Sequence, residues 1–333
     1  MDHISSQIVI PEFFDTDALR LPPYILYRVD GGDRYYYRPD IDRFFRSVTT
    51  KGSANLPTPF GIKEFMMREG QDSIRQRDER AAFGTFTHKL FAEVVINRRF
   101  DLDSIPDRVS DEIRGISPTL RADFDEWVSA TRQDVLSIAA FMQERNVTPL
   151  AVEVCLCNEE DGTAGALDLV CRMDVQVDAL DHDNPYKSGA RKGQPREVKK
   201  TIRPVTILDY KSSRKGFYEA HELQLHLYKR MWDANFPDLP AEVVGNIAPT
   251  DWKTTPKLTF KDQTDSKQAD LIPEILSLDE KRFPQEPSKR LVVSGLLDLD
   301  SDLSSCYTFK DAREIIMEPE SDRVDEEDVE VGE

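Results

Sequence analysis

Apolar residues recur along this chain at two different spacings, and the change between them separates helical from strand-like segments. Over residues 79–98 and 123–145 they recur every three or four positions, which predicts two amphipathic helices. A shorter helix is expected over residues 62–75. Ahead of it, two β-prone runs at residues 24–29 and 34–38 flank an Asp-Gly-Gly-Asp sequence, which predicts a β-hairpin.

From residue 150 onward the pattern changes to short, continuous apolar runs. Residues 150–157, 165–173 and 205–211 each predict a buried strand. A helix is then expected from 218 to about 235, followed by a strand at 242–248. Helices, strands, a further helix and a further strand indicate an α/β domain, with a central mixed sheet flanked by helices.

Residues 183–203 interrupt the strands with polar residues, Gly and Pro, and we expect a mobile inserted loop there. Between Lys187 and Arg203 the segment has seven basic residues and one acid. It is either a solvated loop without a partner or a basic arm that contacts phosphates. Towards the C-terminus, residues 291–299 could form a strand, and the acidic residues 318–333 predict a disordered tail.

Composition is that of a soluble protein, with 39% hydrophobic and 32% charged residues. No apolar run is long enough for a membrane span, and residues 1–14 lack the basic start of a secretory signal, so we expect a cytoplasmic protein without a membrane partner. The cysteines form no CxxC pair, which favours buried thiols over a zinc or iron–sulfur site. They are Cys155, Cys157, Cys171 and Cys306.

The net charge of −18 argues against a nucleic-acid partner, but its distribution weakens that objection. Residues 314–333 contain ten acids and one base, so half of the excess lies in a short tail. A catalytic metal site also gathers carboxylates and is acidic until its cations bind. The charge therefore makes DNA binding less expected without excluding it.

Two aspartates interrupt apolar strands at positions where neither could be buried alone at low cost. Asp168 lies in one predicted strand and Asp209 in another, with Lys211 two residues after Asp209 and hence on the same strand face. Each alone is best explained as a turn residue or a cross-strand salt bridge. Together they predict a Mg²⁺ or Mn²⁺ site with a cation beside it, the set that phosphodiester cleavage requires.

Five short motifs in a fixed order resemble the PD-(D/E)XK nuclease superfamily in its RecB-like branch. The resemblance spans about residues 24–250 and implies a restriction-endonuclease-like core. The N-terminal motif is similar to the start of the core in phage-type and mitochondrial-type exonucleases of this family. The motifs are Ser47-Val-Thr-Thr50, Gly84-Thr-Phe-Thr-His88, Gly165-x-x-Asp168, Asp209-Tyr-Lys211 and Gln224-x-x-x-Tyr228.

The resemblance assigns roles to these positions. Asp168 and Asp209 would be metal ligands, joined by His88 and by the backbone carbonyl of Tyr210 as a candidate further ligand. Lys211 would be the catalytic lysine. A second group of residues would support the metal site or contact DNA, namely Glu153, Ser212, Gln224 and Tyr228. Without the resemblance, His88 is a satisfied helix histidine, Glu153 an exposed strand charge and the Gln224/Tyr228 pair a polar helix stripe.

The expected organisation is an N-terminal segment with a hairpin at residues 1–45, a nuclease core at 46–260 and a C-terminal extension at 261–317, followed by the acidic tail. The expected activity is a Mg²⁺-dependent deoxyribonuclease, an exonuclease by resemblance alone, acting in phage or bacterial DNA recombination, replication or repair. A recombination or replication protein is a candidate partner, and a phage-encoded chain would act in the bacterial cytoplasm. The cysteines do not follow the pattern of cluster-containing members, so no iron–sulfur cluster is expected. The alternatives are an RNA nuclease with the same catalytic residues and a catalytically silent DNA-binding or assembly protein.

Overall fold

The computed structural model describes most residues from the predicted hairpin to residue 287. The predicted strand at 291–299, the acidic tail at 318–333 and Cys306 lie outside the described part. The described residues are 7–9, 22, 24, 26–30, 33–212, 217–250 and 254–287.

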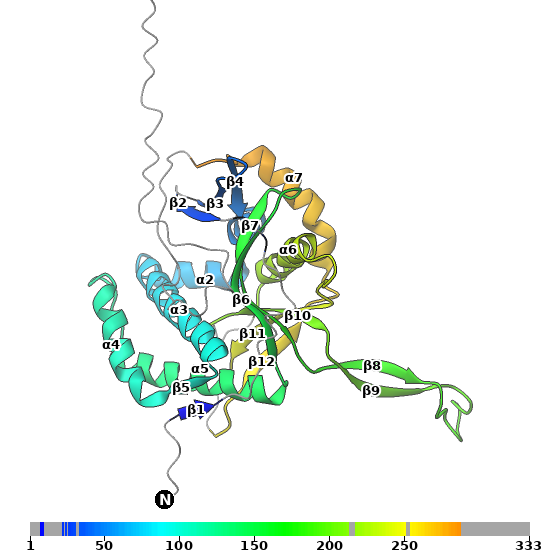
Figure 1. Ribbon diagram of the computed structural model, residues 1–333. Coiled ribbons are helices and arrows are strands. Elements are labelled where there is room, and N and C mark those ends of the chain that lie inside the picture. The colour runs from blue at the N-terminus through cyan, green and yellow to red at the C-terminus, as the bar shows by residue number, and fades with distance from the viewer. Residues whose placement is uncertain are drawn as a thin grey trace, which may run out of the picture.

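A mixed β-sheet forms the centre of the molecule, which confirms the predicted α/β class with helices on both faces (Figure 1). Neighbouring strands run in the order β12-β11-β10-β7-β4-β3-β2, and β6 pairs with β7. The β10–β11 and β4–β7 pairs are parallel and the others are antiparallel. The strands are β2 (Tyr27–Asp30), β3 (Arg34–Arg38), β4 (Arg43–Ser47), β6 (Thr148–Asn158), β7 (Thr163–Arg172), β10 (Val205–Tyr210), β11 (Val243–Pro249) and β12 (Leu258–Asp262).

Strand β7 has an unpaired stretch along one edge. Its partner β6 follows nearly the whole of one side, from Thr163 to Arg172. On the other side, β4 pairs only with residues 163–164 and β10 only with residues 169–172. Residues 165–168 therefore lie in a gap between two partner strands, and the predicted site residue Asp168 is at the end of this gap.

Helices cover the two faces of the sheet and define two apolar cores. One core lies under α3, α4 and α5 and includes Leu208 and Tyr210 of β10. The other lies under α1, α6 and α7 and includes Val205 and Ile207, so successive residues of β10 alternate between the two cores. The helices are α1 (Val48–Asn55), α2 (Phe60–Glu69), α3 (Asp72–Asn97), α4 (Ile105–Gly115), α5 (Phe124–Glu144), α6 (Glu219–Asn235) and α7 (Ile272–Arg282). Outside these elements lie two 3₁₀ turns, η2 (Leu102–Ser104) and η3 (Lys267–Leu271), and a small pair of strands, β1 (Gln7–Val9) with β5 (Arg99–Asp101).

The predicted helix over residues 62–75 is wrong, because two helices meet inside it. Helix α2 ends at Glu69, and Gly70 takes a positive φ of 56°, which residues other than glycine rarely adopt. Helix α3 then starts at Asp72, seven residues before its predicted start, and continues to Asn97. The other two predicted helices agree with α5 and α6 to within two residues at each end.

The segment 183–203 is only partly the loop that its composition predicts. Strand β9 (Arg196–Ile202) pairs along its whole length with β8 (Val175–Asp181), and the two strands form a ribbon that projects from the body of the molecule (Figure 1). Six of the seven residues of β9 are exposed, so hydrogen bonds of the ladder, rather than burial, define this strand. An exposed strand lacks the apolar alternation that sequence patterns detect.

Helix α7 is attached to the N-terminal strands by a buried group of charges. Asp279, which is fully buried, forms ion pairs with Arg46 and Lys51, both 1% exposed. Asn55 donates to the same carboxylate at 2.7 Å, and Arg46 also reaches Asp33 at 2.6 Å. We call Arg46, Lys51, Asn55 and Asp279 the α7 charge cluster.

The helices and the cysteines of the described part bear on two sequence predictions. Among the helices of the described part, none is long and apolar enough to cross a membrane. The three described cysteines, Cys155, Cys157 and Cys171, are buried and carry free thiols, and burial raises the pKa of each thiol.

Candidate functional site

The unpaired edge of β7 opens into a cleft of about 460 Å³. Its walls come from elements far apart in the sequence: the β2–β3 hairpin, the start of α1, the middle of α3 and the first half of α6. The carboxylates of Glu153, Asp168 and Asp209 line it together. The other lining residues are Arg28, Arg34, Tyr36, Ser47, Thr49, Ala81, Gly84, Thr85, His88, Lys89, Gly165, Ala166, Lys211, Gln224 and Tyr228.

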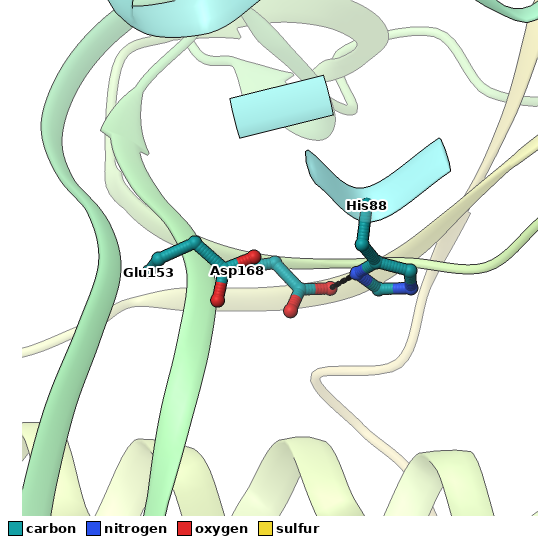
Figure 2. A group of neighbouring side chains, drawn as sticks. All are labelled: His88, Glu153 and Asp168. Carbon is teal, nitrogen blue, oxygen red and sulfur yellow. Dashed lines mark ion pairs between the residues drawn. The ribbon is translucent and has the colours of Figure 1, made fainter. Parts of the chain in front are cut away.

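Three of these side chains bring potential ligand atoms together. One ligand atom each of His88, Glu153 and Asp168 lies within 4.8 Å of the other two. Figure 2 shows His88 reaching down from α3 towards the Asp168 carboxylate, with Glu153 beside it on the neighbouring strand; the His88 Nδ1 to Asp168 Oδ2 distance is 3.6 Å. Glu153 has a positive φ of 49°, a strained backbone for a residue with a side chain.

At the end of the gap in β7, the side chain of Asp168 accepts the hydrogen bond of a backbone N–H of β10. Its Oδ2 accepts a hydrogen bond of 2.7 Å from the backbone N–H of Tyr210. Burial alone would raise the pKa of this carboxyl, but His88, Lys211 and the Tyr210 N–H together lower it. Asp168 is therefore held as a carboxylate and can accept a cation.

The other two carboxylates are shifted in the opposite direction. Burial raises the pKa of Glu153 to about 8, and the charge of Asp168 adds to the shift. Burial also raises the pKa of Asp209 to about 6, with Asp168 contributing although Lys211 opposes it. Three carboxyl groups in one buried cleft thus have more negative charge than they can hold without a cation, so a metal ion would relieve this repulsion.

Asp209 and Lys211 project from the same strand face, as predicted, and contact each other. Lys211 Nζ lies 2.7 Å from Asp209 Oδ2 and 3.2 Å from Gln224 Oε1. Asn246 donates to the same Asp209 oxygen at 2.7 Å from the parallel strand β11. These contacts fix the ammonium group of Lys211 at the edge of the cleft.

Gln224 and Tyr228 lie on one face of α6 and complete this arrangement. Gln224 Nε2 donates to Tyr228 Oη at 2.8 Å and contacts Asp209 Oδ1 at 3.3 Å. Tyr228 packs against Gly165 so closely that a Cβ added there would be 3.0 Å from its ring. The glycine three residues before Asp168 is therefore explained by the approach of α6 to β7.

Seven of the nine residues singled out from the sequence line this one cleft: His88, Glu153, Asp168, Asp209, Lys211, Gln224 and Tyr228. Tyr210 is fully buried, contacting Asp168 through its N–H and stacking on Phe91 at 4.9 Å, and the role of its carbonyl stays a prediction. Ser212 lines a neighbouring cavity instead.

Sequence reasoning missed several residues of the cleft. Arg28 and Arg34 lie on the hairpin wall, and Lys89 on the wall formed by α3. Asn246 was also missed, although a lone amide in the apolar run 243–248 was a usable signal. The arginines gave no such signal, because only the pairing of β4 with β7 brings the hairpin to the site.

The donor set fits a hard divalent cation. Carboxylate oxygens and one imidazole suit Mg²⁺ or Mn²⁺, and no cysteine lines the cleft among the described residues. His88 faces the site with 31% of its side chain exposed, so its imidazole is accessible.

The chain was also compared with known proteins. No protein-family model matches it, and no curated protein matches it significantly.

Proposed function

We propose that this protein is a metal-dependent nuclease that hydrolyses the phosphodiester bonds of DNA. The observation that carries the proposal is the convergence of His88, Glu153, Asp168, Asp209 and Lys211 in one cleft. These residues come from one helix and three hydrogen-bonded neighbouring strands, β6, β7 and β10. Isolated acidic clusters are common, but a buried carboxylate set with a lysine fixed beside it is the arrangement that phosphodiester hydrolysis needs.

The same convergence supports the resemblance to the PD-(D/E)XK superfamily and a restriction-endonuclease-like core. The motif residues Asp168, Asp209 and Lys211 lie on adjacent strands, and the motif helix α6 delivers Gln224 to both Asp209 and Lys211. His88 faces them from α3, as the histidine-containing members of the RecB-like branch imply. An exonuclease acting in phage or bacterial DNA recombination, replication or repair remains the specific form of the proposal.

Within this proposal, His88, Glu153 and Asp168 would hold Mg²⁺ or Mn²⁺, with Asp209 beside them. The bound cation would neutralise the scissile phosphate and acidify an attacking water. Asp168 is oriented for this role by the Tyr210 N–H. Glu153 is protonated in the metal-free cleft at neutral pH, since its pKa is about 8, and it would release that proton on binding the cation.

Lys211 would act on the substrate rather than on the metal. Its ammonium group is held by Asp209 and Gln224, with 17% of its side chain exposed to the cleft. From that position it can donate a hydrogen bond to a phosphate oxygen or to the attacking water and stabilise the negative charge that develops in the transition state. Arg28 and Arg34, which also line the cleft, add positive charge where the DNA backbone would pass.

Hydrolysis of end-labelled linear DNA and closed circular DNA tests the proposal, with Mg²⁺ or with a chelator. We expect the linear substrate to be degraded with Mg²⁺ only, and activity to fall by at least about 10³-fold in Asp168→Ala and in Lys211→Ala. Lys261→Ala is the matched control, because Lys261 pairs with Glu222 on the surface of β12 outside the cleft. Cleavage of the circle would make the enzyme an endonuclease. Intact DNA under every metal condition, with a mobility shift, would refute hydrolysis and favour a silent DNA-binding protein.

A further inference from the structure

A second hollow, of about 620 Å³, lies beside the catalytic cleft between α3 and α5. These two helices pack against each other over the same face of the sheet (Figure 1). We call it the α3–α5 cavity. Its lining residues are Arg75, Gln76, Glu79, Arg80, Phe83, Arg121, Glu126, Trp127, Ala130 and Ser212.

Only a narrow boundary separates the α3–α5 cavity from the catalytic cleft. Gly84 lines the cleft and Ser212 lines the cavity, and a Cβ added to Gly84 would lie 3.1 Å from the Ser212 hydroxyl oxygen. Ser212 directly follows the lysine of the catalytic cleft. The contact between Gly84 and Ser212 is therefore the boundary between the cleft and the cavity.

The lining of the cavity combines aromatic side chains with walls that carry arginines and glutamates. Phe83 is half-buried and meets Trp127 edge to face at 5.0 Å, whereas Trp127 is 4% exposed, so Phe83 offers the accessible aromatic surface and Trp127 lies directly against it. Arginines outnumber glutamates three to two among the lining residues. Arg75 is fixed by ion pairs to Asp72 at 2.7 Å and Glu79 at 3.1 Å.

This combination suits a nucleotide. Aromatic side chains stack on the faces of bases, and guanidinium groups bind phosphates and also stack on bases. A volume of about 620 Å³ lies inside the range of about 300–1,000 Å³ that holds small organic ligands. A simple anion would not need the aromatic side chains, and an apolar ligand would not need the arginines.

We propose that the α3–α5 cavity binds an unpaired nucleotide of the substrate strand, next to the phosphate held in the catalytic cleft. This inference rests on the proposed function and narrows it to DNA that is single-stranded on this side of the scissile bond. Bases inside a duplex are stacked and paired, so their faces cannot reach an aromatic side chain unless the strand is opened. The cavity thus selects single-stranded or frayed ends.

Tryptophan fluorescence gives a direct test, because Trp127 lines the cavity. Trp232 is fully buried in the core on the other face of the sheet, and Trp252→Phe removes the third tryptophan. The protein is titrated, with a chelator present to prevent hydrolysis, with an oligothymidylate and with a blunt duplex of equal length. We expect quenching by the single strand and none by the duplex.

Two double variants of equal charge separate a specific site from general attraction. Arg80→Ala with Arg121→Ala removes two cavity arginines, whereas Arg77→Ala with Arg132→Ala removes two exposed arginines, one in α3 and one in α5, outside the cavity. The first pair should weaken single-strand binding about tenfold, and the second should change it less than twofold.

Equal weakening by both double variants, or unchanged Trp127 emission at saturating oligonucleotide, would overturn the proposal. DNA hydrolysis is measured separately on the same preparations. Quenching that is sensitive to the cavity arginines, in a protein that hydrolyses no DNA, would support the cavity and refute the nuclease. Hydrolysis without quenching would do the reverse.

Discussion

The α7 charge cluster offers a sharp test of how the N-terminal strands are held to the rest of the protein. Asp279 is fully buried and is the shared partner of Arg46 and Lys51, which are almost as buried. Replacing Asp279 by alanine removes the carboxylate that pairs with both buried cations. It also removes the acceptor for the Asn55 amide, which donates to Asp279 at 2.7 Å.

The magnitude follows from what remains after the substitution. Breaking a buried ion pair by removing one partner costs about 3–5 kcal/mol. Arg46 keeps its contact with Asp33 at 2.6 Å, and Lys51 keeps a hydrogen bond of 3.1 Å to the Asp161 carbonyl, so the low end applies. We expect Asp279→Ala to lower the free energy of unfolding by about 3 kcal/mol, which corresponds to about 4–5 °C in the melting temperature of a chain of 333 residues.

Thermal unfolding followed by circular dichroism measures this loss. Asp178→Ala is the control, because Asp178 forms an ion pair of 2.6 Å with Lys199 but is 83% exposed, so its loss should leave the melting temperature unchanged. Adding Lys51→Met to Asp279→Ala should recover part of the stability, since it removes one stranded cation. A melting temperature unchanged in Asp279→Ala, or a double variant that loses the sum of the two single losses, would refute the reasoning.

Three further predictions concern the catalytic cleft. Gly165→Ala should force the Tyr228 ring away from β7 and destabilise the protein by about 1–3 kcal/mol, because the new Cβ would lie 3.0 Å from that ring; an unchanged melting temperature would contradict this close packing. Asn246→Ala removes the hydrogen-bond donor that lies 2.7 Å from Asp209, which should raise the pKa of that carboxyl further. The acid limb of the pH–rate profile should then move to higher pH. An acid limb that stays at the wild-type pH would show that Asp209 does not control it. Burial raises the pKa of Glu153 to about 8. Between about pH 4.5 and 8 the metal-free folded state therefore binds more protons than the unfolded state. The free energy of unfolding without metal should consequently fall as the pH rises through this window. Added Mg²⁺ should reverse that fall by displacing the proton; denaturant titrations with and without Mg²⁺ that give the same pH dependence would exclude Glu153 as a ligand.

The sequence predicts the central sheet and most of the site because burial leaves a readable pattern there. Strands β6, β7 and β10 are almost wholly buried, so their apolar runs stand out, and a charge such as Asp168 or Asp209 inside them is conspicuous. The contact between Asp209 and Lys211 follows from strand alternation alone.

Other parts of the fold leave no local signal. The gap along β7 depends on where two partner strands stop, and the arginines Arg28 and Arg34 reach the cleft only through that pairing. The 233-residue separation between Arg46 and Asp279 likewise cannot be read from spacing. Exposed strands such as β9 carry no apolar alternation, which is why a ribbon was expected to be a loop.

The β8–β9 ribbon has a consequence for how this chain could be altered. The chain leaves the sheet after Arg172 and returns at Val205, and these two residues already face each other in the β7–β10 ladder. The base of the ribbon belongs to the core, because Val175 is 3% exposed there. Farther out, Asp178 and Lys199 face each other, so a tight hairpin turn between them should allow the outer ribbon to be removed without moving either catalytic strand. The entropy of closing a loop grows only slowly with its length, so insertions at this point are inexpensive as well. The same junction is thus a natural place for lineages to exchange accessory modules, and for a dye or surface tether to be attached away from the chemistry.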